Sequence, residues 1–286
     1  MKTVKDAFDR FKTDLTGMYS TQETDAITSL LLSDLTGKNK GWLKAFDSYE
    51  MSTEQSQQLL DALEQLKTGK PIQYILGHTE FYGLNFMVNP SVLIPRPETE
   101  ELVEWVLASV DRETKYDILD MGTGSGCIPI CLKKFLPAST VASIDLSAEA
   151  LQTAERNAEL NQVDVKFLQA DILNLAEPEV TSKQYNVIVS NPPYVTMTDK
   201  EQMHQNVTNF EPHTALFVSN EQPLIFYEAI ASFAHTNLTK NGFLFFEINE
   251  SYGNKTVDML LAKGFVNIEL RQDMTGKDRM IKAMKT

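Results

Sequence analysis

The chain carries an unusual turn, Asn191-Pro192-Pro193-Tyr194, directly after an apolar stretch over residues 185–190 that reads as a buried strand. Two adjacent prolines remove two backbone donors and exclude a helix. Asn191 and Pro192 offer carbonyl oxygens, and Tyr194 offers a flat ring. These groups could accept both N–H hydrogens of a planar amide or exocyclic amine and stabilise charge that develops on its nitrogen. The alternative is a rigid turn between a strand and a loop.

A glycine-rich loop lies upstream, in the sequence Asp120-Met-Gly122-Thr-Gly124-Ser-Gly126. Glycines between a first strand and a first helix let a ligand approach the backbone closely. The spacing does not fit the G-x-G-x-x-G pattern of dinucleotide-binding proteins. A pyrophosphate would disfavour a neighbouring carboxylate, so Asp120 predicts a cationic ligand that carries an ammonium or sulfonium group.

Two further acids follow the next two predicted strands. Asp145 comes about 20 residues after the glycine loop, where an acid can accept hydrogen bonds from ribose hydroxyls. Asp171 is followed by Ile172, a pair that can bind an adenine amino group and cover the ring. Each acid alone could be a strand-end cap or a turn residue. Three acids at successive strand ends, at one edge of an open sheet, indicate a ligand site.

From residue 116 onward, predicted strands alternate with predicted helices, and these elements position the residues described above. The pattern predicts strands over 116–121, 140–145, 165–170, 185–190 and 242–248, and helices over 126–136, 147–160, 224–237 and 253–263. This rhythm predicts an α/β fold with a mostly parallel, Rossmann-like sheet covered on both faces. The last two strand-like runs, 265–272 and 279–285, are joined too closely for a helical crossover, so we expect them to be antiparallel.

The chain before residue 93 has a different pattern. Residues 1–72 predict a small helical bundle, with Val4, Phe8 and Phe11 at helical spacing and capping boxes at 20–23 and 52–55. Residues 73–92 predict a β-hairpin linker whose strand-like runs are Tyr74–Gly77 and Glu80–Val88. The motifs described above lie in a third domain, residues 93–286. The bundle bears no catalytic motif and could be a cap or a domain that recognises a partner.

The composition argues against several other classes of protein. A net charge of −13 disfavours a protein whose main ligand is a phosphate backbone. The apolar runs are far shorter than a membrane span, and the N-terminus lacks the apolar core of a signal peptide. Cys127 and Cys131 lie four apart in a predicted helix, as small core residues of a reduced, cytoplasmic protein would. The four histidines are scattered, so we expect no metal site.

With these motifs and the closing strand pair, residues 95–286 resemble a class I S-adenosylmethionine-dependent methyltransferase, a fold of seven strands with an antiparallel last strand. In that superfamily Asn-Pro-Pro-Tyr is similar to the motif of enzymes that methylate planar nitrogens. The resemblance implies catalytic roles for Asn191, Pro192 and Tyr194, and substrate contacts by these three residues and Pro193. It implies that S-adenosylmethionine binds, and S-adenosylhomocysteine leaves, through Gly122, Thr123, Gly124, Ser125, Gly126, Asp145, Asp171, Ile172 and Asn191.

Other runs resemble the PrmC/HemK family of protein-glutamine methyltransferases, over nearly the whole chain. They are Pro71–Gly77, Leu93–Glu100 with its Pro-Arg-Pro-Glu-Thr-Glu sequence, and Phe210-Glu-Pro212 followed by Ala215-Leu216. The resemblance implies methylation of the glutamine in the Gly-Gly-Gln motif of class I peptide chain release factors, which modulates translation termination. The chain departs from the family at Asn249, where a glycine is common, and at Gln222-Pro223. Arg96 either reaches the site or pairs with Glu98 or Glu100.

Two other functions remain possible at this point. An adenine-N6 methyltransferase acting on DNA or RNA shares the Asn-Pro-Pro-Tyr motif, but the acidic balance and the lack of an obvious base-reading domain disfavour nucleic acid as a direct substrate. A catalytically silent binding module would not need the acids and the motif together. A single glutamine offers little surface for recognition, so we expect the helical domain and the loop 196–217 to grip the release factor.

Overall fold

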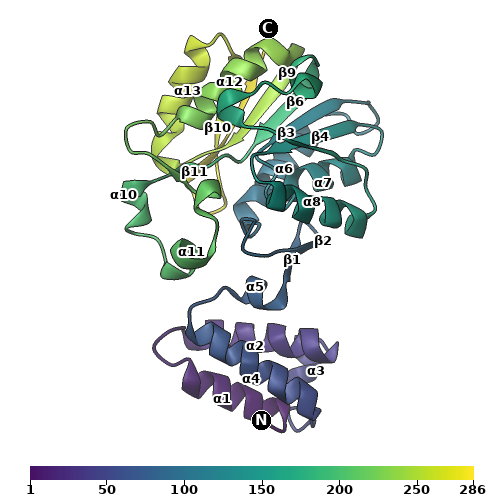
Figure 1. Ribbon diagram of the computed structural model, residues 1–286, viewed down its shortest axis with the longest axis vertical. Coiled ribbons are helices and arrows are strands. Elements are labelled where there is room, and N and C mark those ends of the chain that lie inside the picture. The colour runs from purple at the N-terminus through teal and green to yellow at the C-terminus, as the bar shows by residue number, and fades with distance from the viewer. The chain divides into compact units, whose positions relative to one another are not determined.

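The computed structural model describes residues 1–286 (Figure 1). The chain divides into two compact units. The first contains residues 1–77 together with 205–210, and the second contains residues 78–204 and 211–286. None of the helices combines the length and the apolar character needed to cross a lipid bilayer.

The first unit is helical. Its helices are α1 (Val4–Asp14), α2 (Thr21–Thr36), α3 (Lys40–Ala45), α4 (Thr53–Lys67), α5 (Ile72–Leu76) and α11 (Gln205–Phe210). Phe11, Leu32 and Leu63 are fully buried in one apolar core. Ser52 forms the predicted capping box, whereas Ser20 makes only half of its box, by accepting from the Glu23 N–H. The periodic apolar residues therefore meet as the sequence predicts.

Residues 72–76 form helix α5 and not a strand, so the predicted first arm of the hairpin is wrong. Pro71 caps the start of this helix, and Gly77 caps its end with a φ of +78°, a left-handed conformation that suits glycine. The hairpin itself is β1 (His78–Phe81) and β2 (Leu84–Met87), paired antiparallel in the second unit. Tyr82 and Gly83 both have positive φ, as the tight turn of a two-residue hairpin requires.

The second unit is built on a seven-stranded sheet, which confirms the predicted fold. Its order is β10-β11-β9-β6-β3-β4-β5, and β11 alone runs opposite to the other six strands. The strands are β3 (Asp117–Met121), β4 (Thr140–Asp145), β5 (Lys166–Gln169), β6 (Tyr185–Ser190), β9 (Leu238–Glu247), β10 (Val266–Gln272) and β11 (Asp278–Met284). The chain continues from β3 to β4 on one side and returns to β6 on the other. Ligands bind at such a switch point, beyond the carboxyl ends of the strands.

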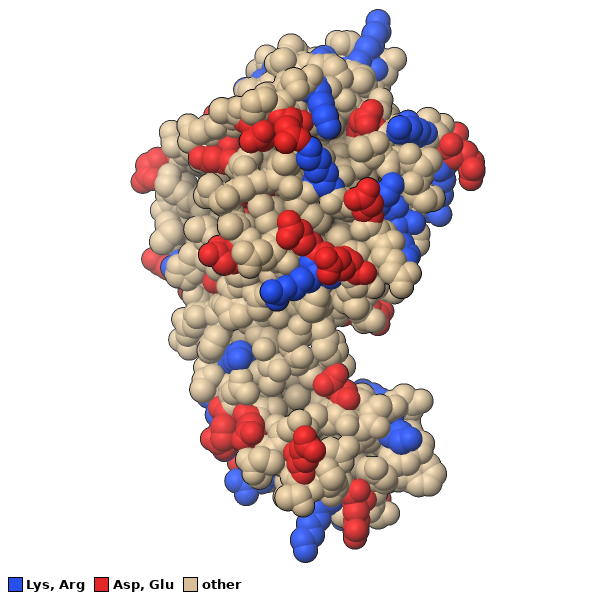
Figure 2. Space-filling model, turned by 45° about the vertical axis from the view of Figure 1, so that its right-hand side comes forward, with Lys and Arg blue, Asp and Glu red and all other residues tan.

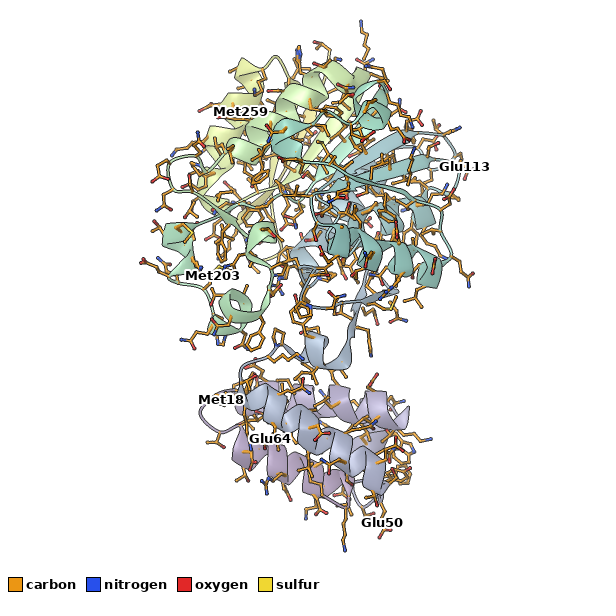
Figure 3. All side chains as sticks on the ribbon, in the orientation of Figure 1. Met18, Glu50, Glu64, Glu113, Met203 and Met259 are labelled. Carbon is orange, nitrogen blue, oxygen red and sulfur yellow. The ribbon has the colours of Figure 1, made fainter.

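Helices cover both faces of this sheet (Figure 1). One face packs against α6 (Pro97–Ser109), α7 (Cys127–Phe135) and α8 (Ala148–Asn161). The other packs against α12 (Ile225–Asn237) and α13 (Gly253–Ala262), which carries Met259 (Figure 3). Within β6, Val187 and Val189 belong to the first apolar cluster and Ile188 to the second. Because successive side chains of a strand point to opposite faces, a continuous apolar strand such as β6 fits only a sheet buried on both sides.

The segment after β6 is ordered by short elements. Strand β7 (Val195–Thr196) pairs in parallel with β8 (Phe217–Val218), so the two ends of the segment 196–217 lie together. Between them come α10 (Met197–Lys200) and α11, joined by a stretch that contains Met203 (Figure 3). A short helix α9 (Pro178–Thr181) precedes β6.

Candidate active site

A cavity of about 660 Å³ opens at the carboxyl ends of the central strands. Cavities of this size bind cofactors and drug-sized molecules. Most of its lining comes from the glycine loop, from the ends of β4, β5 and β6, and from residues 91–99. Of the residues predicted for the site, it is lined by Gly122, Thr123, Gly124, Ser125, Asp145, Asp171, Ile172, Asn191 and Pro193.

The glycine loop fits a ligand that lies against the backbone. Gly122 and Gly124 have φ of +98° and +52°, and a Cβ on Gly124 would meet nothing within 4 Å. A Cβ on Gly122 would lie 3.7 Å from the backbone oxygen of Asn191. Because β3 and β6 are adjacent and parallel, the glycine loop and the Asn-Pro-Pro-Tyr turn meet at one edge of the sheet.

Gly126 does not line the cavity but begins helix α7. A Cβ on this residue would lie 2.9 Å from Ile130 Cδ1 and 3.0 Å from Ala154 Cβ. Gly126 therefore allows α7 and α8 to pack closely beneath the loop.

Asp120 does not line the cavity, contrary to the expectation that it meets a cationic ligand. Its carboxyl is fully buried, and the strand register places Ser143 directly opposite it on β4. The Ser143 hydroxyl donates to Asp120 Oδ2 at 2.6 Å and lies 2.5 Å from the Thr123 hydroxyl. Burial raises the pKa of Asp120 well above its usual value, with the Ser143 hydrogen bond acting in the opposite direction. Asp120 is therefore linked to the glycine loop through Ser143 and Thr123, on the side of the loop that faces the core.

The two remaining acids are held by backbone donors. Asp145 accepts from the N–H of Gly124 and from that of Ser147, each at 2.9 Å. Burial raises the pKa of Asp145, and these backbone hydrogen bonds oppose that effect. Asp171 accepts from the Leu173 N–H at 2.8 Å and so caps a short 3₁₀ helix. Both acids also line the cavity, so the turn role that the structure shows does not exclude the predicted ligand role.

Apolar side chains beside these acids were missed from the sequence. Leu146 is 60% exposed and Leu173 is 39% exposed, although both lie next to a buried sheet. Both line the cavity, as does Phe226 at the start of α12. The sequence signal that could have identified them is a leucine one or two residues after each strand-end acid, because a flat base needs apolar surface on its faces.

The Asn-Pro-Pro-Tyr turn presents two of its residues to the cavity, Asn191 and Pro193. Pro192 and Tyr194 lie behind them, and the Tyr194 hydroxyl donates to Glu247 Oε1 at 3.0 Å. The carbonyl of Pro192 accepts no hydrogen bond from the chain.

A buried carboxylate at the end of β9, Glu247, connects the turn to helix α6. Its Oε2 accepts from the Thr99 hydroxyl at 2.7 Å, and Thr99 Oγ1 in turn accepts from Asn191 Nδ2 at 3.2 Å. Burial raises the pKa of Glu247, and the hydrogen bonds from Thr99 and Tyr194 and the charge of Arg279 act in the opposite direction. Neither Thr99 nor Glu247 was predicted as a site residue, because they are 148 residues apart and only the fold brings them together.

Arg96 takes neither of the two partners considered from the sequence. It lines the cavity and forms an ion pair with Glu211, a carboxylate only 4% exposed that also accepts from the Ile94 N–H at 3.1 Å. Two runs used for the family resemblance, Leu93–Glu100 and Phe210–Pro212, therefore meet through this pair. Asn249, where the chain departs from the family, donates to the backbone oxygen of Tyr194 at 3.1 Å, a bond that a glycine could not make.

The sheet order with its antiparallel β11, together with the glycine loop and the acids around one cavity, is that of a class I S-adenosylmethionine-dependent methyltransferase. Residues 6–77 match the PrmC N-terminal domain, and residues 100–211 match the methyltransferase small domain. The chain belongs to the family of release factor glutamine methyltransferases, which confirms the resemblance found in the sequence.

Two relatives and one solved structure illustrate this membership. The release factor glutamine methyltransferase of Flavobacterium psychrophilum is 50% identical over 223 residues, which cover 77% of each chain. That of Bacteroides thetaiotaomicron is 40% identical over 274 residues, or 94% of this chain and 95% of the other. The 16S rRNA N2 G1207 methyltransferase of T. thermophilus, solved with AdoMet and guanosine, has a TM-score of 0.53 at 17% identity, over 73% of this chain and 50% of that one. This last likeness shows the fold.

Proposed function

We propose that the protein transfers the methyl group of S-adenosylmethionine to the side-chain amide nitrogen of the glutamine in the Gly-Gly-Gln motif of class I peptide chain release factors. The observation that carries this proposal is that the Asn191 turn meets the glycine loop. The backbone oxygen of Asn191 lies 3.7 Å from the position that a Cβ on Gly122 would take. The names of the relatives support the release factor as substrate. The two free cysteines are buried and unpaired, which suits a reducing compartment and supports a cytoplasmic site of action.

The residues around the cavity fit the cofactor by chemical type. We assign the ribose hydroxyls to Asp145, whose carboxylate is already oriented by two backbone donors. We assign the adenine to Asp171 and Ile172, with Leu146 and Leu173 on its faces. The glycine loop leaves open space for the methionyl part beside Asn191. When bound, S-adenosylmethionine supplies a methyl group made electrophilic by the sulfonium sulfur.

The substrate amide must be activated, because its nitrogen lone pair is delocalised. We assign one N–H to the side-chain oxygen of Asn191 and the other to the backbone oxygen of Pro192, so that both acceptors stabilise the positive charge that develops on nitrogen. We assign the contact with the planar group to Pro193, which lines the cavity, with Tyr194 behind it. In this reaction a nitrogen–carbon bond would form as the carbon–sulfur bond breaks, the electron pair of that bond would go to the sulfonium sulfur, and the nitrogen would release a proton to water. Alignment of the two reactants supplies much of the rate.

The helical unit and the segment 196–217 are the proposed contact regions for the folded release factor. The segment contributes Thr214 and Ala215 to the cavity lining, so part of it borders the substrate entrance. On the face seen in Figure 2, Lys and Arg are interspersed with Asp and Glu and form no continuous basic surface. This mixture does not favour the alternative function, adenine methylation in DNA or RNA.

A labelling experiment tests the function directly. The protein is incubated with methyl-labelled S-adenosylmethionine and a class I release factor, the same factor with its Gly-Gly-Gln glutamine changed to alanine, or single- and double-stranded DNA and RNA. We expect label only in the first sample. Label in nucleic acid, or equal label in the alanine factor, would contradict the proposal.

A further inference from the structure

Under the proposed function, the oxygen and the NH₂ group of the Asn191 side chain have different roles. Its oxygen must accept from the substrate amide, whereas its NH₂ group cannot, so a rotation by 180° about the terminal bond would replace an acceptor with a donor. Nothing in the shape of a carboxamide prevents that rotation. A polar neighbour that distinguishes the two ends is therefore required.

Thr99 can distinguish the oxygen of the Asn191 side chain from its NH₂ group, because the single hydroxyl proton of Thr99 is already donated to another residue. The Thr99 hydroxyl donates to Glu247 Oε2 at 2.7 Å, so towards Asn191 it has only a lone pair to offer. It accepts from Asn191 Nδ2 at 3.2 Å. If the amide rotated, two oxygens would face each other without a proton between them. Thr99 therefore holds the NH₂ group of Asn191 and leaves the oxygen for the cavity side.

Glu247 sets the direction of this chain of hydrogen bonds. Its second oxygen accepts from the Tyr194 hydroxyl at 3.0 Å, so both oxygens of the carboxylate act as acceptors. Glu247 and Thr99 are 1% and 2% exposed, where a lost hydrogen bond leaves a polar group without water to replace its partner. Thr99 lines the cavity, whereas Glu247 does not. Glu247 can act on the reaction only through its neighbours.

We infer that Glu247 and Thr99 are positioning residues that fix the side-chain amide of Asn191 with its oxygen towards the substrate. This inference rests on the proposed function, since it assigns that oxygen to the glutamine amide. It also gives a physical reason for the Pro-Glu-Thr-Glu run, because Thr99 is the threonine in it. A neutral glutamine at position 247 could not replace the carboxylate, since its NH₂ group would have to donate to Thr99 or to Tyr194.

The first test removes the Thr99 hydroxyl and keeps the shape of the side chain. We expect Thr99→Val to lower kcat by roughly 10- to 100-fold, the range found when a group that orients a metal ligand is lost, with the affinity for S-adenosylhomocysteine unchanged. Thr99→Ser restores a hydroxyl and should recover most of the rate. Thr256→Val is the matched control, because Thr256 is equally buried but its hydroxyl donates to the Tyr252 carbonyl within α13.

A double-mutant cycle tests whether Thr99 acts through Asn191. In an Asn191→Ala background, Thr99→Val should change the rate by less than about twofold, because the side chain it orients is gone. Costs that multiply in the double variant, or a Thr99→Val enzyme as fast as the unmodified one, would overturn the inference.

A spectroscopic measurement separates this inference from the proposed function. The side-chain ¹⁵N–¹H signals of Asn191, assigned by their loss in Asn191→Ala, should shift in Thr99→Val and Glu247→Gln and stay in place in Thr256→Val. Unchanged signals in the first two variants overturn the positioning role, whatever the substrate. If the unmodified enzyme fails to label the release factor, the proposed function is wrong. The NMR signals would still show whether Thr99 and Glu247 orient the side-chain amide of Asn191.

Discussion

At the scale of single residues, the acids that line the cavity also hydrogen bond to the backbone of the site. Asp145 orients the glycine loop through Gly124 and the start of α8 through Ser147, and it lines the cavity. A carboxylate has about four lone-pair directions, so two backbone donors leave two for ribose hydroxyls. If the proposed ribose contact forms, the glycine loop and the ligand share this carboxylate.

Replacing Asp145 should weaken cofactor binding. We expect Asp145→Ala to lower the affinity for S-adenosylhomocysteine by about 1–3 kcal/mol, the scale of hydrogen bonds to a charged acceptor, with the deficit measured by calorimetry. Asp145→Asn keeps the shape and should lose less. Glu113→Ala, in the exposed loop between α6 and β3 (Figure 3), serves as a control and should bind normally. Unchanged affinity in a folded Asp145→Ala protein would remove this residue from the site.

Replacing Asn191 should affect turnover far more than cofactor binding. Loss of one preorganised partner costs roughly a hundred- to a thousand-fold in rate, and we expect Asn191→Ala to fall in this range. Single-turnover kinetics on the release factor, with S-adenosylhomocysteine affinity measured in parallel, provide the test. If the rate survives, the motif is only a turn.

The sequence predicts ligand-facing residues better than the residues behind them. The glycines and the strand-end acids stand in local patterns that can be read without the fold. Thr99 and Glu247 carry no local signal, because their roles come from a contact between a helix and a strand on distant parts of the chain. Asp120 shows the converse, since its local pattern suggests a ligand and its place in the register with Ser143 directs it into the core.

At the scale of elements, the third glycine of the loop sets how closely two helices pack. We expect Gly126→Ala to destabilise the second unit by more than Gly276→Ala does. Both glycines have φ above +80°, which costs an alanine about 1–2 kcal/mol. Only at Gly126 would the methyl group also meet Ile130 and Ala154, which adds about 1–3 kcal/mol. Equal losses in denaturant unfolding would show that α7 and α8 adjust freely.

The sequence predicts whether a segment is a helix or a strand well where apolar residues recur periodically over many residues. It does so poorly where the apolar run is short. The alternating strands and helices after residue 116 all form. The run Tyr74–Gly77 was assigned to a strand because it is short, aromatic and branched, and periodicity cannot separate such a run from a helical turn. Pro71 and Gly77 flank it and decide in favour of the helix.

At the scale of the whole molecule, the role proposed for the helical unit can be tested by removing it. Deletion of residues 1–70 should leave cofactor affinity intact and lower methylation of the intact release factor much more than that of a short Gly-Gly-Gln peptide. The deletion also removes the residues that α11 packs with, so a second truncation should replace 205–210 by a glycine–serine linker. If either truncated enzyme methylates the whole factor as fast as the full chain does, the unit is a cap and not a docking domain.

Helix α11 also has a consequence for synthesis on the ribosome. It packs with residues 1–77, where the side chain of Asn206 approaches the Cβ position of Gly69 to 3.1 Å and is hydrogen bonded to Tyr19. Residues 1–77 emerge first, and at roughly 5–20 residues per second α11 follows on the order of 10 s later. Until then the nascent helical unit lacks one of its helices. A nascent chain therefore cannot complete the helical unit before β6 and the Asn191 turn have been synthesised.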